Sequence, residues 1–147
     1  MAAPVTDGAP PIAIYRRMQE AVLHGEGHEA TLLPAELLAD DVVVETPFAP
    51  VGMRRYDGRE AWLSYYRTAG AGLLVRFERF DELATHRTDD SETLVVEYEL
   101  TGKVIATGVR ASVRCIAVLR VHDGLITHWC EYQDIASITE ALTRPAP

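Results

Sequence analysis

The sequence lacks the features that mark several broad classes of protein. It has two cysteines, Cys115 and Cys130, with no CxxC pair, and we interpret both as reduced, buried residues rather than metal ligands. No apolar run approaches the roughly 18 residues of a membrane span. With a net charge of -8, the chain also lacks the basic excess that binds nucleic acid or anionic membranes, so we expect neither partner.

The length of 147 residues indicates a single domain. Residues 1–10 lack the basic and apolar regions of a signal peptide, and we expect a disordered lead-in there, a domain at 11–143 and a tail at 144–147. A cytoplasmic location is the matching expectation. The five histidines have no converging ligand spacing, so we expect no metal and no organic cofactor.

The pattern of apolar residues predicts both helices and strands. Helical spacing predicts helices at 11–23, where Tyr15 belongs to the apolar stripe, at 30–38 and at 59–68, and a short helical tail at 135–142. Alternating and β-branched runs predict strands at 42–46, 73–86, 93–105, 109–121 and 125–134, with a loop at 48–56. Helices followed by a meander of strands predict an α+β fold, in which a curved, cone-shaped antiparallel sheet wraps around N-terminal helices and leaves a pocket at its open end.

The last predicted strand carries the strongest candidate for a catalytic residue. Because side chains alternate along a strand, Glu131 shares a face with Thr127, Trp129 and Gln133. A carboxylate beside an indole, on a face expected to be buried, is typical of a general acid or base. A carboxylate at the sheet rim, in water or paired with an arginine, is the alternative, and this segment alone leaves both open.

Three segments carry a likeness to known proteins. They are Leu38–Pro47, which covers the first predicted strand, Tyr56–Ala61, which opens the third helix, and Val121–Thr127, the final hairpin before Trp129. Together they resemble the nuclear transport factor 2-like superfamily, in its SnoaL-like branch, over about Ile12 to Leu142. The resemblance implies the cystatin-like α+β barrel of that superfamily. Its members include ketosteroid isomerases, polyketide cyclases, limonene-type epoxide hydrolases, phenazine biosynthesis proteins and binding modules, so the fold leaves the activity open.

The catalytic positions of ketosteroid isomerase are not kept in this chain. The resemblance puts its aspartate base on Thr46, its tyrosine near Met18 and its protonated aspartate near Ala117. Isomerisation by that set of residues is therefore not expected.

Two other branches share one carboxylate with this chain. The arginine and first aspartate of the limonene-type epoxide hydrolases fall at Tyr98 and Leu100, which leaves their last carboxylate as Glu131. The last-strand glutamate of the phenazine biosynthesis proteins also falls on Glu131, and their pocket histidine falls near Tyr65. The resemblance therefore implies one acid–base carboxylate with a polar tyrosine nearby.

Strand alternation assigns the other polar residues to faces. With the strands aligned at the Thr107–Gly108 turn, Tyr98 points inward and Glu97 and Glu99 point outward, opposite Arg114. Glu45 and His128 are also expected on the outer face. Asp134 is predicted to cap the C-terminal helix rather than to act in catalysis.

These residues predict a mostly apolar pocket with few polar groups. The candidate catalytic residues are Glu131, Tyr98 and Thr46. The candidate substrate-binding residues are Met18, Val44, Tyr65, Val113, Cys115, Ala117, Leu119 and Trp129. We predict a cofactor-free isomerase or cyclase of secondary metabolism, acting on a hydrophobic polyketide-, terpenoid- or steroid-like molecule. Glu131 would shuttle a proton, and Tyr98 or Tyr65, with Thr46, would hold the developing oxyanion.

Two other functions remain open at this point. One is a non-catalytic module for small-molecule binding or dimerisation, and the other is an epoxide hydrolase with a non-standard site. The outer sheet face carries Val95, Ile116 and Val118 among charges, which predicts a homodimer through that face.

Overall fold

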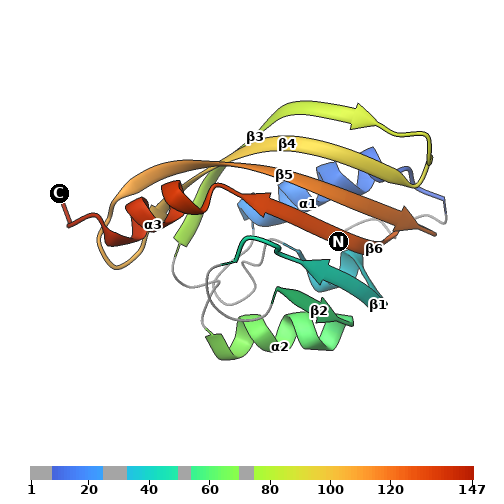
Figure 1. The fold of residues 1–147 in the computed structure, drawn as a ribbon, viewed down its shortest axis with the longest axis horizontal. Helices are drawn as coiled ribbons and strands as arrows, with labels where there is room; N and C mark the ends of the chain where they lie inside the picture. Colours follow the sequence, from blue (N-terminus) through green and yellow to red (C-terminus); the bar gives the residue numbers. More distant parts are fainter. Residues whose placement is uncertain (1–7, 25–32, 50–53, 70–74) are drawn as a thin grey trace.

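A long, curved sheet dominates the computed structural model, which describes residues 8–24, 33–49, 54–69 and 75–147, with the backbone alone at 66–69. Six strands lie in the order β2-β1-β6-β5-β4-β3. They are β1 (Leu38–Glu45), β2 (Arg55–Asp57), β3 (Val75–Arg87), β4 (Thr93–Val104), β5 (Arg110–His122) and β6 (Leu125–Gln133). Figure 1 shows β3 to β6 curving in front of helix α1 (Pro11–His24).

Helix α1 forms because apolar residues recur on one side of it, after two prolines that suit a first turn. This side is buried and packs against β3, β4 and β5. The buried residues are Ile14, Tyr15, Met18 and Val22. The predicted helix at 11–23 is confirmed, and α1 therefore supplies one wall of the interior that the sheet encloses.

The four long strands form the expected antiparallel meander. Asp123 and Gly124 turn the β5–β6 hairpin with φ angles of 49° and 75°, the left-handed geometry that a tight two-residue hairpin favours. Strand β1, however, runs parallel to β6, so the sheet is mixed rather than wholly antiparallel. Because β1 is far from β6 in the chain, no hairpin fixes its direction.

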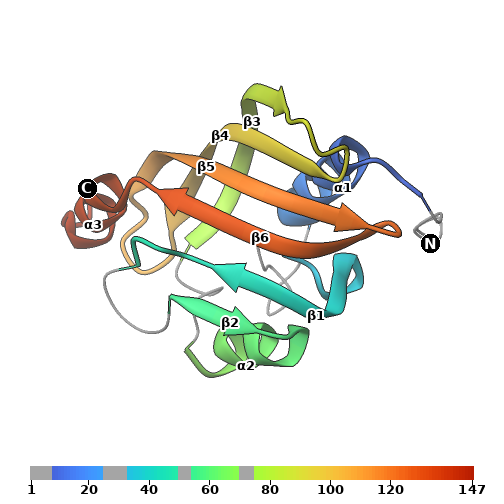
Figure 2. The same cartoon turned by 45° about the vertical axis from the view of Figure 1, so that its right-hand side comes forward.

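The α+β fold class is confirmed, but the sheet does not close into a barrel. Strands β2 and β3 are its two edges (Figure 2). The prediction of a loop at 48–56 was wrong at its C-terminal end, because Tyr56 lies in β2 and pairs with Val44. Helix α2 (Arg59–Ala69) covers this edge and packs against β1 and β2.

The helix predicted at 30–38 is largely wrong where it can be compared. Residues 30–32 lie outside the described part of the chain, and the remainder is one 3-10 turn, η2 (Ala35–Leu37). Pro34 is extended before this turn, and Leu38 already pairs with Ile126 of β6. Sheet pairing therefore overrides the helical preference of the leucines.

The C-terminal helix α3 (Ile135–Thr143) begins as predicted. The backbone N–H of Ser137 donates to Asp134 Oδ1 at 3.1 Å, so Asp134 is the N-cap. The hydrogen bond from the Ser137 hydroxyl to Oδ2, together with this backbone bond, lowers the pKa of Asp134. Both cysteines are buried and unbridged, as expected. None of the helices within the described ranges is long and apolar enough to cross a membrane.

Candidate functional site

Glu131 is the one acidic or basic side chain that is buried among the residues the structure describes. Its side chain lies on the inner face of β6, where only 3% of the residue is exposed. Ala117 of β5 stands opposite Glu131, and Trp129, two residues earlier, is fully buried on the same face. Burying a charge costs free energy unless hydrogen bonds compensate, so the partners of this carboxylate decide its role.

Three side chains donate hydrogen bonds to the Glu131 carboxylate. Tyr98 Oη donates to Oε1 at 2.6 Å, and Gln133 Nε2 donates to the same oxygen at 3.3 Å. Trp129 Nε1 donates to Oε2 at 3.3 Å. The indole and amide nitrogens can only donate, so this set suits the ionised carboxylate. Glu131 is therefore equipped to accept a proton, which is the task of a general base.

Tyr98 is the closest partner of Glu131 and is itself fully buried on β4. Its ring stacks on Phe80 of β3, with centroids 4.8 Å apart and planes at 27°. Burial raises the pKa of Tyr98 well above its usual value, and the charge of Glu131 raises it further. Tyr98 therefore stays a protonated donor at neutral pH, and its proton is directed at Glu131.

Cys115 lies between the donors of Glu131. The register puts Tyr98, Cys115 and Gln133 in one row across β4, β5 and β6. Burial raises the pKa of the Cys115 thiol, and the nearby charge of Glu131 raises it further. A thiol held protonated is a poor nucleophile, so Cys115 lines the site without acting as one.

The remaining candidate residues are the apolar ones, Thr46 and Tyr65. Met18, Val44, Ala117, Leu119 and Trp129 are fully buried in the hydrophobic core, whereas Val113 is half-buried. Thr46 follows β1 and is half-buried, and no hydrogen bond in the described part of the chain joins its hydroxyl to Glu131.

Tyr65 belongs to a separate aromatic cluster on α2 and β2. Its ring centroid is 5.0 Å from that of Tyr56 and 5.9 Å from that of Trp62. Burial raises the pKa of Tyr56, and its hydrogen bond with Tyr65 adds to that rise. Tyr65 therefore lies near the β1–β2 edge of the sheet and not among the donors of Glu131.

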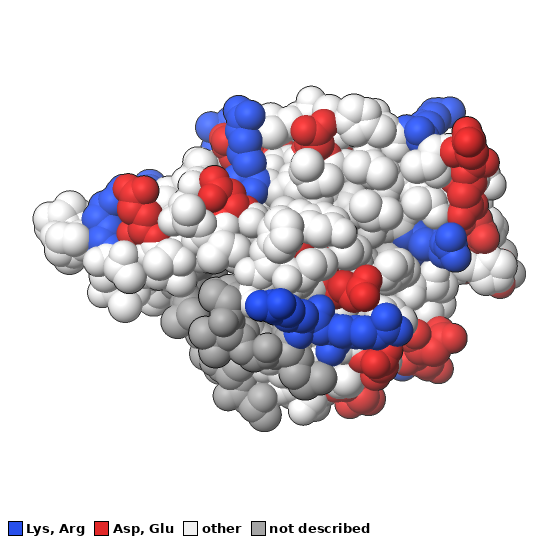
Figure 3. All heavy atoms as spheres, viewed as in Figure 1, with Lys and Arg blue, Asp and Glu red and all other residues white. Residues whose placement is uncertain are grey.

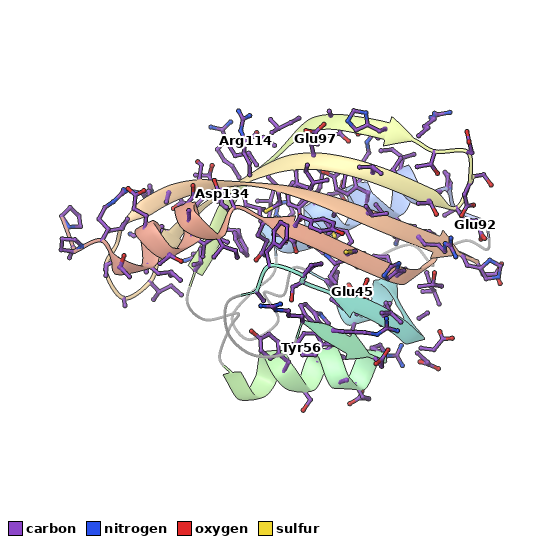
Figure 4. All side chains as sticks on the ribbon, viewed as in Figure 1. Glu45, Tyr56, Glu92, Glu97, Arg114 and Asp134 are labelled. Carbon is purple, nitrogen blue, oxygen red and sulfur yellow. The ribbon has the colours of Figure 1, made fainter. Side chains whose placement is uncertain are left out.

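The outer face of the sheet carries the charges that alternation had assigned to it. Arg114 Nε donates to Glu99 Oε2 at 3.3 Å, and His86 Nε2 lies 2.6 Å from Glu97 Oε2. Glu45 Oε2 is 2.8 Å from His128 Nε2. Figure 3 views this side, opposite α1, where charged side chains stand around a largely uncharged centre, and Figure 4 labels Glu45, Glu97 and Arg114 there. These carboxylates form surface pairs.

Two features of the interior side were missed by the sequence reasoning. A cleft of about 440 Å³ opens between α1 and the edge strand β3, lined by Ile12, Arg16, Glu82, Leu83, Ala84, Thr85, Arg87 and Leu94. The second feature is Tyr15, which the sequence had marked only as part of an apolar stripe. Both depend on how α1 docks onto β3, which no local pattern encodes.

No group of three histidine, cysteine or acidic residues in the described ranges has the geometry of a metal site.

Residues 16–129 match the SnoaL-like domain family. Among curated proteins, the chain is 29% identical over 107 residues to the uncharacterised protein YesE of Bacillus subtilis, an alignment that covers 72% of this chain and 71% of YesE.

Solved structures share the same fold. A Bacillus subtilis protein named as an isomerase superposes with a TM-score of 0.76 at 24% identity, covering 88% of this chain and 90% of that one. A ketosteroid isomerase of a Mycobacterium species gives 0.64 at 25% identity, covering 88% and 97%. Proteins named as polyketide cyclases and an epoxide hydrolase are also similar in fold. The chain belongs to the SnoaL-like domain family of the nuclear transport factor 2-like superfamily.

Proposed function

We propose that the protein is a cofactor-free isomerase or cyclase that moves a proton on a hydrophobic small molecule, with Glu131 as the base. The observation that carries this proposal is a buried carboxylate held by three donors inside an otherwise apolar interior. Perturbed or buried ionisable groups of this kind concentrate at functional sites. The family supports the same class, since isomerases and cyclases are among the proteins of this fold.

The two oxygens of Glu131 are not equivalent. Oε1 accepts from both Tyr98 and Gln133, whereas Oε2 accepts the longer bond from Trp129. A carboxylate oxygen has two acceptor positions, so Oε2 keeps one for a substrate proton. We therefore assign proton transfer to Oε2, and the fixing of the carboxylate to Tyr98 and Gln133.

The proposed step needs no oxidant and no added group. Glu131 Oε2 takes a proton from a carbon next to a carbonyl, the C–H bond breaks, and its electron pair passes to the carbonyl oxygen as an enolate. Glu131 then returns the proton to another carbon. In a cyclase, the enolate carbon instead attacks a second carbonyl of the same molecule, the π bond of that carbonyl breaks, and Glu131 returns the proton to its oxygen. Acid–base help of this kind contributes about 10²- to 10⁴-fold in rate.

A non-catalytic binding module is the rival function, and one observation favours it. The 2.6 Å hydrogen bond from Tyr98 already satisfies Oε1 of Glu131. Buried carboxylates with a purely structural role are hydrogen-bonded in the same way. A binding module predicts ligand affinity without proton exchange, so the two functions separate in one experiment.

Deuterium exchange into 2-tetralone tests the proposal, because this bicyclic ketone has exchangeable protons beside its carbonyl. In D₂O the wild-type protein should speed the exchange above the buffer rate, as followed by NMR. Glu131→Gln keeps the shape of the side chain but cannot take up the proton, so the enzyme-dependent rate should fall about 100-fold or more.

Glu97→Gln is the matched control, since it changes an outward carboxylate on the same sheet. Its exchange rate should equal that of the wild type. A wild-type rate no faster than buffer, or a Glu131→Gln rate equal to the wild type, would contradict the catalytic role and leave the binding module as the better account.

A further inference from the structure

The cleft between α1 and the edge strand β3, which we call the α1–β3 cleft, is a concave site separate from Glu131. Its volume of about 440 Å³ lies within the range of small-molecule pockets. Helix α1 lies alongside this end of the β3–β4 hairpin (Figure 2). Ile12 and Arg16 line it from α1, and residues 82–85, 87 and 94 line it from the hairpin. Glu131 does not belong to this lining.

The inner side of β3 becomes charged where it lines the α1–β3 cleft. Side chains of paired residues share one face of a sheet. Glu82 is paired with Tyr98, which is fully buried. Arg87 is paired with Leu94, which is 5% exposed. Glu82 and Arg87 therefore occupy positions of the core-facing side, and their charges indicate that this end of the sheet meets a polar group rather than more core.

A β-bulge shapes the apolar part of the lining. The register between β3 and β4 shifts between Glu82 and Ala84, so Leu83 has no partner in the ladder. Bulges re-aim side chains and are frequent beside functional sites. Leu83 lines the cleft and is 45% exposed, although its side chain is large and apolar. Leu83 and Leu94 thus give the cleft an apolar surface that a ligand would cover.

The charges of the lining do not cancel. Arg16 and Arg87 against Glu82, two positive charges and one negative, give a formal charge of +1 in a chain whose net charge is -8. Glu82 accepts a hydrogen bond from Thr85 Oγ1 at 2.9 Å and lies 3.9 Å from Arg16 Nη2. In the described part of the chain, no hydrogen bond or ion pair engages the guanidinium of Arg87. An anion in the cleft would give Arg87 a partner.

We propose that the α1–β3 cleft binds an organic monocarboxylate with an apolar body. Arg87 and Arg16 donate to the carboxylate, because a planar guanidinium matches its two oxygens. The apolar body covers Leu83 and Leu94. A phosphate would bring nearly two negative charges beside Glu82, so a single charge fits the lining better. This site is independent of the function proposed for Glu131.

A pair of probes isolates the contribution of the carboxylate. 2-Naphthoate and 2-naphthamide share the same two fused rings, and only 2-naphthoate carries a negative charge at neutral pH. Isothermal titration calorimetry should show that the wild-type protein binds 2-naphthoate at least about fivefold more tightly than 2-naphthamide. Raising the salt from about 20 mM to about 500 mM should remove most of this difference, because salt screens partly exposed charges.

Arg87→Gln tests the arginine that lacks a partner. It should weaken 2-naphthoate binding about fivefold and leave 2-naphthamide binding within about twofold, because it removes only the charge that meets the carboxylate. Arg79→Gln is the matched control on the same strand, since Arg79 Nη2 lies 3.0 Å from Asp81 Oδ2 and outside the cleft lining. It should leave both affinities unchanged.

Glu82→Gln should have the opposite effect. It removes the negative charge from the lining while the amide oxygen can still accept from Thr85, so 2-naphthoate should bind about threefold more tightly. Affinity for 2-naphthamide should not change. A weaker affinity for 2-naphthoate in this variant would contradict the proposed charge match.

Three other results would overturn the site. The first is equal affinity of the wild-type protein for the two probes, or no binding of 2-naphthoate at millimolar concentration. The second is equal weakening by Arg79→Gln and Arg87→Gln, which would indicate a general effect of charge. The third concerns Glu131→Gln, which should bind 2-naphthoate like the wild type. A loss of binding in that variant would put the probe beside Glu131 instead of in the α1–β3 cleft.

Discussion

Carboxylates on the inner and outer faces of the same sheet have different kinds of partner. On the inner face, Glu131 is 3% exposed and its partners are a phenol, an indole and an amide. On the outer face, Glu99 pairs with Arg114, and Glu45 pairs with His128. The inner carboxylate is thus stabilised by neutral donors, and the outer ones by basic groups.

The two kinds of carboxylate should respond differently to substitution. Exposed ion pairs contribute about 0–1 kcal/mol because water and salt screen them, so the outer pairs can change with little effect. The neutral donors around Glu131 leave its charge uncancelled in an apolar interior, where interactions with a ligand are stronger. The comparison therefore predicts that equal substitutions on the two faces have unequal effects.

Tyr98→Phe is expected to have the largest effect of the tests that compare the faces. It deletes the 2.6 Å bond to Glu131 and leaves a buried acceptor short of a donor. The free energy of unfolding should fall by about 1–3 kcal/mol, as measured by urea titration. Glu97→Gln, a change to an exposed hydrogen-bonded group on the outer face, should stay within about 0.5 kcal/mol of the wild type. Equal losses in the two variants would remove the distinction between the faces.

We propose that the outer face pairs with a second copy of the chain. Ile116 and Tyr132 stand opposite each other on β5 and β6 and are 42% and 38% exposed, and Phe48 packs on Tyr132 with centroids 5.3 Å apart. Such a contiguous apolar surface favours burial in an interface. Light scattering should therefore give twice the chain mass of 16.2 kDa at micromolar concentration.

Ile116→Glu should weaken this dimer at least about tenfold in Kd, or about 1.4 kcal/mol, because it puts a charge into the apolar contact. Leu142→Glu changes an exposed apolar residue of α3 and should leave the dimer intact. A monomeric wild-type protein at micromolar concentration would refute the pairing.

The smallest effect is expected at the end of the sheet, where His122 Nδ1 lies 2.6 Å from Glu92 Oε2. This hydrogen bond, with the charges of Asp123 and Glu92, raises the pKa of His122 above 6.5. A raised pKa in the folded state means that the stabilisation is complete below pH 6.5 and is lost as the pH rises through the folded value.

Unfolding measured from pH 6 to pH 8 should therefore show a larger loss of stability in the wild type than in His122→Gln. Glu92→Gln removes the main cause of the shift and should flatten the profile in the same way. Identical slopes in all three proteins would show that the pair does not couple stability to pH.

Local pattern predicted most of the fold because alternation and helical spacing are properties of neighbouring residues. The ends of β4 and β5 fell within one residue of their predicted positions, and the cap at Asp134 was correct. The failures involve pairing between distant segments. Strand β1 begins at Leu38, inside the predicted helix, because β6 offers it a partner, and β2 exists because β1 does.

The same distinction between local pattern and pairing of distant segments applies to the candidate site. Alternation placed Glu131 and Tyr98 on one face, and their contact followed from the antiparallel pairing of β4, β5 and β6. Tyr65 was proposed from resemblance, yet it packs with Tyr56 at the β1–β2 edge. Tyr15 was missed because a tyrosine in an apolar stripe gives no sign that its oxygen lacks a partner among the described residues.

The sequence by itself determined which side chains point inward, because the period of a strand or helix is fixed by backbone geometry. It thereby determined that one carboxylate, Glu131, would enter an apolar interior. Only the tertiary structure decided which donors meet that carboxylate, because strand register joins residues far apart in the chain: Tyr98 and Glu131 are separated by 33 residues. The docking of α1 against β3 then buried the hydroxyl of Tyr15, which has no hydrogen-bond partner among the described residues, since helix packing depends on the shape of both surfaces.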